Sequence, residues 1–300
     1  MRAHQASQTA AKIGRLLVYV SADPRRAALL PTGAAELTEA LLRAAGLWRD
    51  WHRRAYRSHR VRSALDWMED RLLAGQSTHV ALRKRVLDDE TRAAIEAGAV
   101  QVLVVGAGFD TLAFRLARAH RHVRCVEIDH PATQSLKRHA LDLLGDLPLN
   151  LWLQPADLGA TPLPEVLDEL GWDRRARSVV VAEGVLMYLG EHEVADFLRG
   201  VASRMVPGSR LLGTYLVPDA QGRPYVGKLG GVTRASLRAI GEPLRWATTP
   251  EALAALLDDT GFRMRDEPGR VDLRLRYLVP AGLGDLPLPD HERVLVAERR

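Results

Sequence analysis

The sequence predicts an α/β fold built around a mostly parallel β-sheet. The first observation is the run Val102–Val105, in which four aliphatic residues are followed by Gly106-Ala107-Gly108 and a segment with helical spacing. A short apolar run bounded by glycine is typical of a buried parallel strand. The second observation is that apolar runs and helical patterns alternate from there onward, as in parallel strands joined by helices. The third is a final pair of runs with no helix between them, which predicts an antiparallel edge.

The composition is typical of a globular protein in a reducing compartment. The chain has 300 residues, of which 47% are hydrophobic, so it can bury a sizeable core. Its single cysteine, Cys125, excludes a disulfide framework and a cysteine-based zinc site. The early apolar run Leu16–Val20 is too short for a signal peptide, and no run approaches the roughly 20 residues that cross a bilayer. We therefore expect a soluble, cytoplasmic protein with no membrane partner.

Arginine dominates the basic residues of the chain, whose formal net charge is +5. Arginine suits carboxylate and phosphate contacts, but a modest basic excess is weak support for nucleic-acid binding, and we expect no nucleic-acid partner. Aromatic residues and arginines interleave in Arg49–Arg62. This pattern has three interpretations: a solvated helix face with Trp51 and Tyr56 turned inward, an RNA surface, or an arginine that meets an anionic substrate.

The region before the first predicted strand is expected to form a helical cap. Residues 1–30 mix small and polar residues, and Pro24 and Pro31 interrupt any long helix there. Helical spacing then extends over Glu36–Leu73, and the glycine-containing stretch Gly75–Thr78 ends it.

The rest of the chain supplies the alternating elements, and residues 218–250 form an irregular, glycine-rich insertion with one short helix. The strands are expected at Val102–Val105, Val123–Ile128, Leu149–Gln154, Ser178–Ala182, Arg210–Val217, Phe262–Asp266 and Arg293–Glu298. The helices are expected at His79–Ala97, Thr111–Ala119, Pro131–Leu144, Pro164–Leu170, Glu191–Met205, Thr233–Gly241 and Pro250–Thr260.

The glycine turn after the first strand predicts a bound nucleotide-like ligand. Gly106 and Gly108 allow a ligand to lie close to the backbone, at the N-terminus of the next helix. A dinucleotide site has a third glycine, but Thr111 stands at that position. The Gly-Lys-Ser/Thr of a phosphate-binding P-loop is also missing. A shorter turn favours a ligand without a pyrophosphate, such as S-adenosylmethionine (SAM).

Acidic residues follow the second and third predicted strands. Glu127 and Asp129 come about 20 residues after the glycine turn, where an acid binds ribose hydroxyls in nucleotide-binding folds. Asp157 and Leu158 end the third strand, where an acid could accept from the adenine amine while Leu158 packs on the ring. Ordinary polarity at strand ends is the alternative for each pair.

Four ordered motifs together resemble the leucine carboxyl methyltransferase family. They read VLVVGAGFDTLAFRL from Val102, CVEIDHPATQSLKR from Cys125, ADL from Ala156 and VAEGVLMYL from Val181, and the upstream ALRKRVLDD resembles the family's arginine motif. The family is similar to the eukaryotic enzyme that methylates a phosphatase C-terminus, and bacterial members include polyketide carboxyl methyltransferases. The resemblance implies a Rossmann-like class I methyltransferase fold. Its sheet would have seven strands in the order 3-2-1-4-5-7-6, with helices on both faces.

The resemblance also implies roles for individual residues. Arg83 would bind the SAM carboxylate, Asp129 would hold the ribose, Glu183 would lie beside the methionine end, and Tyr188 would face the substrate. The remaining residues expected at the cofactor are Gly106, Ala107, Gly108, Asp110, Glu127, Asp157 and Leu158. The family's threonine after the arginine is Lys84 here, so the geometry around Arg83 is open.

The expected organisation is a cap and substrate lid over residues 1–78 and a SAM-binding domain over 79–300. Residues 218–250 would add to the substrate pocket. We expect a small-molecule or peptide carboxylic acid as substrate, SAM as the only cofactor, no metal, and a monomer or homodimer.

The chemistry of methyl transfer leaves the acceptor open. A carboxylate is ionised at neutral pH and needs only alignment, for which Tyr188, Tyr215 or an arginine of the cap are candidates. A phenol or alcohol would need a base, for which His192, or less well His130, is a candidate. The third alternative is a non-catalytic SAM-binding module.

Overall fold

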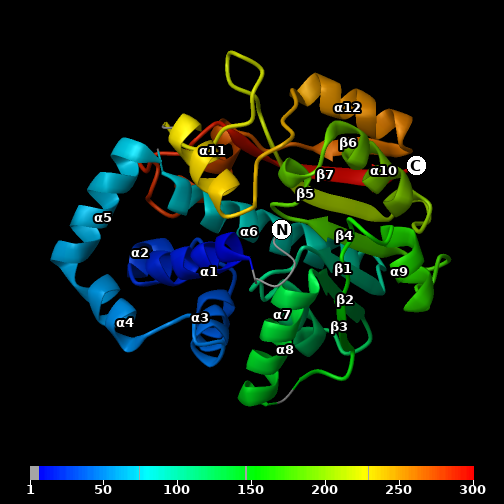
Figure 1. Cartoon of the computed structure of the whole chain (residues 1–300), viewed down its shortest axis with the longest axis horizontal. Coiled ribbons are helices and arrows are strands. Elements are labelled where there is room, and N and C mark those ends of the chain that lie inside the picture. Colours follow the sequence, from blue (N-terminus) through cyan, green and yellow to red (C-terminus); the bar gives the residue numbers. More distant parts are fainter. Residues whose placement is uncertain (1–6, 74, 146, 229) are drawn as a thin grey trace.

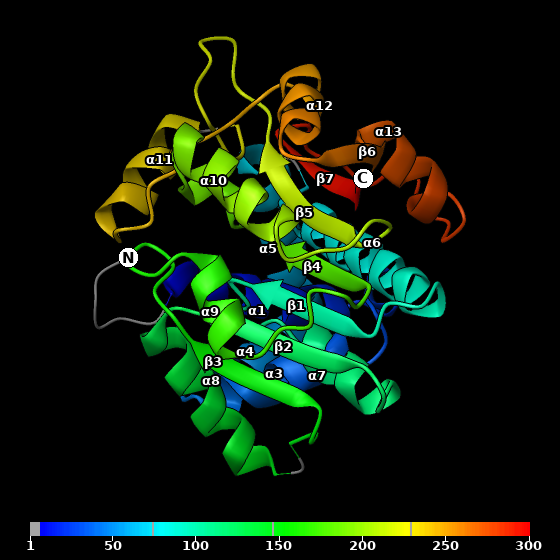
Figure 2. The ribbon, with the colours of Figure 1, turned by 90° about the vertical axis from the view of Figure 1, so that its right-hand side faces the viewer.

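A seven-stranded sheet forms the centre of the computed structural model, which describes residues 7–73, 75–145, 147–228 and 230–300. The strand order is β3-β2-β1-β4-β5-β7-β6, as predicted (Figure 2). The strands are β1 (Gln101–Val105), β2 (Arg124–Asp129), β3 (Leu151–Pro155), β4 (Ser178–Ala182), β5 (Arg210–Leu216), β6 (Phe262–Asp266) and β7 (Glu292–Arg299).

Strands β1 to β5 pair in parallel, whereas β7 runs antiparallel between β5 and β6. The predicted antiparallel edge is therefore confirmed. Because all five parallel strands point the same way, the turns after β1, β2, β3 and β4 meet at one edge of the sheet, where ligands bind in open α/β folds.

Helices cover both faces of the sheet. One apolar core lies under α6 (Gln76–Glu96), α7 (Leu112–Ala119) and α8 (Pro131–Leu144). The other lies under α9 (Leu163–Glu169), α10 (Glu191–Ala202) and α12 (Pro250–Asp259). Successive strand residues point to opposite faces, so Val104 faces the first core and Leu103 the second.

Residues 7–73, the described part of the N-terminal region, form five helices, which lie to the left of the sheet in Figure 1, in blue to cyan. They are α1 (Gln8–Ser21), α2 (Pro24–Ala27), α3 (Ala34–Ala44), α4 (Asp50–Arg57) and α5 (His59–Leu72). The expectation that Pro24 and Pro31 break any long helix holds, because α1 ends before the first and α3 begins after the second. The helical stretch predicted over Glu36–Leu73 is divided in three.

Helix α1 was not predicted as a complete helix. Its Gly14 lies against the side chains of Leu42 and Thr38 on α3, where a Cβ would come within 3.1 and 3.2 Å of them. The glycine therefore serves close helix packing rather than a turn. Leu17 and Val18 of α1 belong to the same core as the sheet, so the cap shares the main core.

The interpretation of Arg49–Arg62 as a solvated helix face with Trp51 and Tyr56 turned inward is partly wrong. Tyr56 is half-buried against Tyr19, but Trp51 is 59% exposed instead of turned inward. Residues 218–250 contain α11 (Gly230–Ala239) and reach the cap, because the Lys228 N–H donates to the Leu72 carbonyl at 2.9 Å. In the described part of the chain, every helix is too short or too polar to span a bilayer.

Candidate functional site

The turn after β1 is shaped by two glycines in the left-handed region. Gly106 has a φ of +64° and Gly108 a φ of +50°. A Cβ on Gly106 would lie 2.6 Å from the Cγ2 of Val185, and one on Gly108 would lie 2.8 Å from the Cβ of Ala10. A side chain is thus excluded at both positions by backbone conformation and by space. The first turn of α1 lies directly over this loop.

Asp129 at the end of β2 braces the glycine turn. One carboxylate oxygen accepts from the Gly108 N–H at 2.5 Å and the other accepts from the His130 N–H at 2.6 Å. Burial raises the pKa of Asp129, while both N–H groups oppose that shift. Each oxygen keeps a lone pair, so the carboxylate can still accept from ribose hydroxyls. The position expected from the sequence is therefore compatible with the structure.

Glu127 has a different environment from Asp129. It is fully buried and lies 2.6 Å from the Lys137 Nζ of α8, which is also fully buried. Burial raises the pKa of Glu127 and the lysine opposes that shift. Both acids point to the same face of the sheet, but Glu127 lies two residues deeper, beneath α8. Lys137 also donates to the Asp110 carbonyl, so Glu127 supports the turn from behind, and Asp129 is the acid that contacts its backbone.

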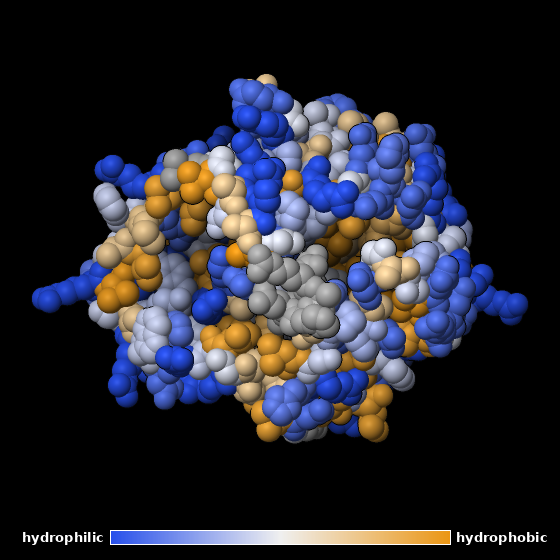
Figure 3. Space-filling model, in the orientation of Figure 1, coloured by the Kyte–Doolittle hydropathy of each residue, from blue (hydrophilic) through white to orange (hydrophobic). Residues whose placement is uncertain are grey.

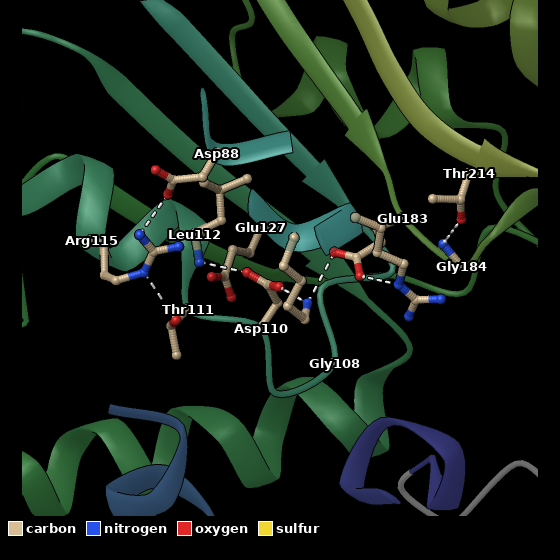
Figure 4. A network of polar contacts seen from close by, with 12 residues as sticks. Asp88, Gly108, Asp110, Thr111, Leu112, Arg115, Glu127, Glu183, Gly184 and Thr214 are labelled. Atoms are coloured by element: carbon tan, nitrogen blue, oxygen red, sulfur yellow. Dashed lines mark hydrogen bonds and ion pairs between the residues drawn. The ribbon is translucent and has the colours of Figure 1, made fainter. Parts of the chain in front are cut away.

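Four charged side chains link α6 to the turns after β1 and β4. The Arg83 Nε donates to Glu183 at 2.8 Å, and Lys84 donates to Glu183 at 2.9 Å and also to Asp110. Figure 4 shows Asp110 and Glu183 approaching one another from the two turns. Burial disfavours the charged forms, but the opposite charges prevail and raise the pKa of Arg83 and of Lys84, while Lys84 holds the pKa of Asp110 below its usual range.

A second buried cluster on the other side of Arg83 was not predicted. Glu292 at the start of β7 accepts two hydrogen bonds from the Arg83 Nη1, at 2.8 and 2.7 Å, and lies 3.2 Å from the His79 Nε2. Burial disfavours its charge, but Arg83 and His79 hold the pKa of Glu292 well below its usual range. Burial lowers the pKa of the neighbouring His291 to about 4, so this imidazole is neutral at pH 7.

Asp157 and Leu158 lie beside the turn, at the adjoining strand end. The Ala156 N–H donates to the Asp129 carbonyl at 2.9 Å, which fixes the loop after β3 next to β2. Asp157 is exposed and caps its own turn by accepting from the Gly159 N–H at 3.0 Å. Leu158 packs against the second core. The arrangement is compatible with the expected adenine site.

The three predicted catalytic residues do not lie together. Tyr188 adjoins the charged network: burial raises its pKa to about 12, with Glu242 raising it further and Thr9 and Arg83 opposing. Tyr215 is fully buried in the second core and donates to Glu267. On β5 it is the neighbouring Thr214 that faces the site, where its hydroxyl accepts from the Gly184 N–H at 2.9 Å.

The side chains of the two histidines considered as bases do not join the buried charged network. His192 is exposed in the first turn of α10. His130 precedes α8, and its Nδ1 accepts from the Ala132 N–H at 3.4 Å, so it caps that helix. The histidines that the structure brings to Arg83 are His79 and His291. Neither follows a motif, so the sequence offered no signal for them.

The site fits the charges of SAM, a zwitterionic amino acid that carries a sulfonium. Arg83 and Lys84 provide cations for its carboxylate, and Asp110 and Glu183 provide anions for its ammonium and sulfonium. The Arg83 Nη2 donates to no residue that the structure describes, so it is free to bind a carboxylate. Gly106 provides the side-chain-free surface that a closely bound ligand needs.

Comparisons with known proteins identify the family of the chain. The family model for leucine carboxyl methyltransferase matches residues 31–202. A protein from Parafrankia sp. (strain EAN1pec), provisionally named a SAM-dependent methyltransferase, is 30% identical over 214 residues, covering 68% of this chain and 64% of the relative. YktD from Bacillus subtilis (strain 168), named in the same way, is 29% identical over 171 residues, covering 55% and 54%. The chain thus spans between half and two thirds of the length of these curated relatives.

A solved structure shows the same fold. A provisionally named methyltransferase from Thermobifida fusca YX superposes with a TM-score of 0.55 at 20% identity, covering 91% of this chain and 96% of that one. This likeness concerns the fold alone. The family model, by contrast, matches more than half of the chain. The protein therefore belongs to the leucine carboxyl methyltransferase family.

Proposed function

We propose that the protein is a SAM-dependent O-methyltransferase that methylates a carboxyl group of a small-molecule or peptide acid. The observation that carries the proposal is the alternation of cations and carboxylates around the glycine turn, from Arg83 through Glu183 and Lys84 to Asp110. This pattern complements an amino-acid zwitterion. Membership of the family supports the methyl donor and the carboxyl acceptor.

Bound SAM would supply a methyl group activated by a positive sulfur. Arg83, Lys84, Asp110 and Glu183 would hold its methionine end, and Asp129 its ribose. Because these side chains already hold one another in the described structure, the site is preorganised and little ordering entropy is lost on binding. Alignment of the reacting groups is the main catalytic contribution, worth up to roughly 7–11 kcal/mol in ideal cases. The displacement requires no Lewis acid, in keeping with the expectation that no metal takes part.

Tyr188 favours a carboxyl acceptor over a phenol. With a pKa of about 12 it keeps its proton at physiological pH, so it can donate a hydrogen bond but cannot act as a base. A carboxylate, which is ionised at neutral pH, accepts such a bond and needs no base. Tyr188 would therefore orient an acceptor oxygen while the other oxygen attacks the methyl group.

A phenol or alcohol acceptor is the second candidate, and one observation favours it. The His291 imidazole is neutral, and its Nε2 is buried with no hydrogen-bond partner among the residues that the structure describes. Its ring lies beside that of Tyr225 in the 218–250 segment, with the ring centroids 5.5 Å apart and the ring planes tilted by 55°. His291 lies close to Arg83 and could accept a hydroxyl proton there, whereas His192 is exposed on α10. A pKa of about 4 makes this imidazole a weak base for a phenol or alcohol, so the carboxyl acceptor remains the first candidate.

The division into a cap over 1–78 and a SAM domain over 79–300 remains part of the proposal. It is supported by the contact between Lys228 and Leu72, which brings the 218–250 segment to the cap. Both parts would then border the acceptor. A monomer or homodimer in the cytoplasm remains the expected form.

The test combines SAM titration with methyl transfer. Calorimetry should show SAM binding to the unchanged chain and at least about tenfold weaker binding for Arg83→Ala and for Asp129→Ala, since each variant loses charged hydrogen bonds. Unchanged affinity in both variants would refute the site. Formation of S-adenosylhomocysteine with carboxylic acids, and not with matched phenols, would support the carboxyl acceptor. Binding without turnover on either panel would indicate a non-catalytic module.

A further inference from the structure

The cap contains a groove of about 440 Å³ that the proposed cofactor site does not use. It lies between α1, α4 and α5 and the first turn of α6, and its volume falls within the range of small-molecule sites. In Figure 3 apolar side chains gather around a hollow on the left, over α4 and α5. The residues that line the groove include Trp51, Met68 and Leu72, whose large side chains are 59%, 46% and 38% exposed.

The lining of the groove changes from cationic to apolar along α1. Lys12 and Arg15 line one end, and Leu16 and Tyr19 line the other. The cationic end is the one nearer the cofactor site, because Lys12 lies one helical turn after Thr9, which adjoins Tyr188. A ligand in the groove would therefore place an anionic group toward Tyr188 and an apolar body toward Tyr19.

The two cations have no ion-pair partner in the described ranges of the chain. Other arginines of the cap do: Arg26 pairs with Asp66, and Arg43 pairs with Glu39 and Asp50. The carboxylate that lines the groove, Glu69, accepts from the Ser77 N–H at 2.5 Å and is buried. The lining thus carries two cations against one carboxylate, and the accessible positive charge lies at the end of Lys12 and Arg15.

We propose that this groove binds an apolar monocarboxylic acid, with its carboxylate on Lys12 and Arg15 and its alkyl or aryl body between Tyr19, Tyr56 and Leu65. Charge complementarity selects the head group, and the apolar lining selects the body. The inference rests on the proposed function, because the bound carboxylate would be the methyl acceptor. It names the cap cations that orient this acceptor, and they come from α1 instead of Arg49–Arg62.

The experiment measures binding of a series of straight-chain alkanoates by calorimetry without SAM. Each added methylene should tighten binding by up to about fourfold until the groove is filled. The alcohol of equal length should bind at least about tenfold more weakly than the acid, since it lacks the charge. Arg15→Gln and Lys12→Gln should each reduce that difference, and Met68→Gln should weaken long acids more than short ones.

The matched control is Arg43→Gln, a cap arginine that already has partners and should leave every affinity unchanged. Equal affinities for acid and alcohol, or no effect of Arg15→Gln and Lys12→Gln, would overturn the inference. If the acids bind as described but are never methylated, the groove assignment stands and the proposed function fails. If acids are methylated while these variants bind them normally, the proposed function stands and the groove assignment fails.

Discussion

The ion pair beneath the cofactor site is buried, whereas a comparable ion pair of the cap is exposed to solvent. Glu127 and Lys137 are almost completely buried, at 1% and 0% exposure, whereas the cap pair Arg43 and Asp50 is 44% and 72% exposed. Buried charges are tolerated only when each has a partner, so the cofactor region is fixed as a network. Exposed charges interact weakly and can be exchanged at little cost. The molecule thus combines a rigid donor site with a cap whose surface can vary.

The largest effect should come from breaking the buried pair. Lys137→Met leaves Glu127 charged and unpartnered in the core, which should lower the free energy of unfolding by about 3–5 kcal/mol. The matched cap variant, Arg43→Met, should lower it by no more than about 1 kcal/mol. Urea denaturation measures both. Similar losses of unfolding free energy in the two variants would contradict the contrast between the regions. The double variant Glu127→Gln with Lys137→Met should recover much of the stability, because it removes the unpartnered charge.

The next effect concerns acid stability and His291. Its folded pKa of about 4 lies below the ordinary value of 6.5, so the unfolded chain binds the proton first and stability falls as the pH drops through that window. Between pH 7.5 and 5 this group alone should account for about 2 kcal/mol. His291→Asn should therefore flatten the dependence of unfolding free energy on pH.

The control for this measurement is His59→Asn on α5, which removes an exposed histidine of the cap by the same substitution. An equal flattening in both variants would mean that His291 is not held neutral by its burial.

A smaller effect should separate backbone strain from crowding at the glycine turn. Gly106→Ala introduces a side chain at a positive φ and against Val185, whereas Gly171→Ala does so at a φ of +62° with open space around it. The left-handed backbone should lower the free energy of unfolding by about 1 kcal/mol in both variants. The contact with Val185 should lower it by about 1 kcal/mol more in Gly106→Ala. Only Gly106→Ala should also weaken SAM binding in calorimetry. Equal losses would show that Val185 moves aside freely.

The smallest effect should come from the outer face of the cap. Trp67 is 62% exposed and does not line the groove, so Trp67→Ser should change the free energy of unfolding by no more than about 0.5 kcal/mol. Acid binding should also stay unchanged. A clear loss of either would mean that this face is part of the acceptor site, and the cap would then be less variable than proposed.

Sequence patterns predicted the helices and strands that have a regular apolar periodicity and ends marked by proline or glycine. The strands Ser178–Ala182 and Phe262–Asp266 and the helix Pro131–Leu144 have the predicted bounds, because apolar runs, proline and glycine mark them. Helix α1 escaped prediction because its glycine serves packing against α3, a tertiary contact that no local pattern reveals. The helical turn at Arg270–Leu278 was missed as well.

The site was predictable as far as its motifs extend. Motifs identified Arg83, Asp110, Asp129 and Glu183, which the structure brings to one edge of the sheet. They could not distinguish Asp129 from Glu127, since both lie on the same strand and face and differ only in depth. Glu292 is 209 residues from Arg83 along the chain, and only the position of β7 beside β5 makes them neighbours.

Helix α6 runs without interruption from the groove of the cap to the cofactor site. Its first turn lines the groove at Ser77, and its second and third turns carry Arg83 and Lys84. Six residues of α-helix span about 9 Å, and this spacing cannot stretch or bend as a loop can. The helix thus holds the apolar end of the groove, where Ser77 bonds to Arg26, at a fixed distance from the charged residues of the cofactor site. An acid whose apolar body rests there would be selected by its length, because its carboxyl group must reach the methyl donor. Changes in the cap could therefore alter substrate shape without moving the point of transfer.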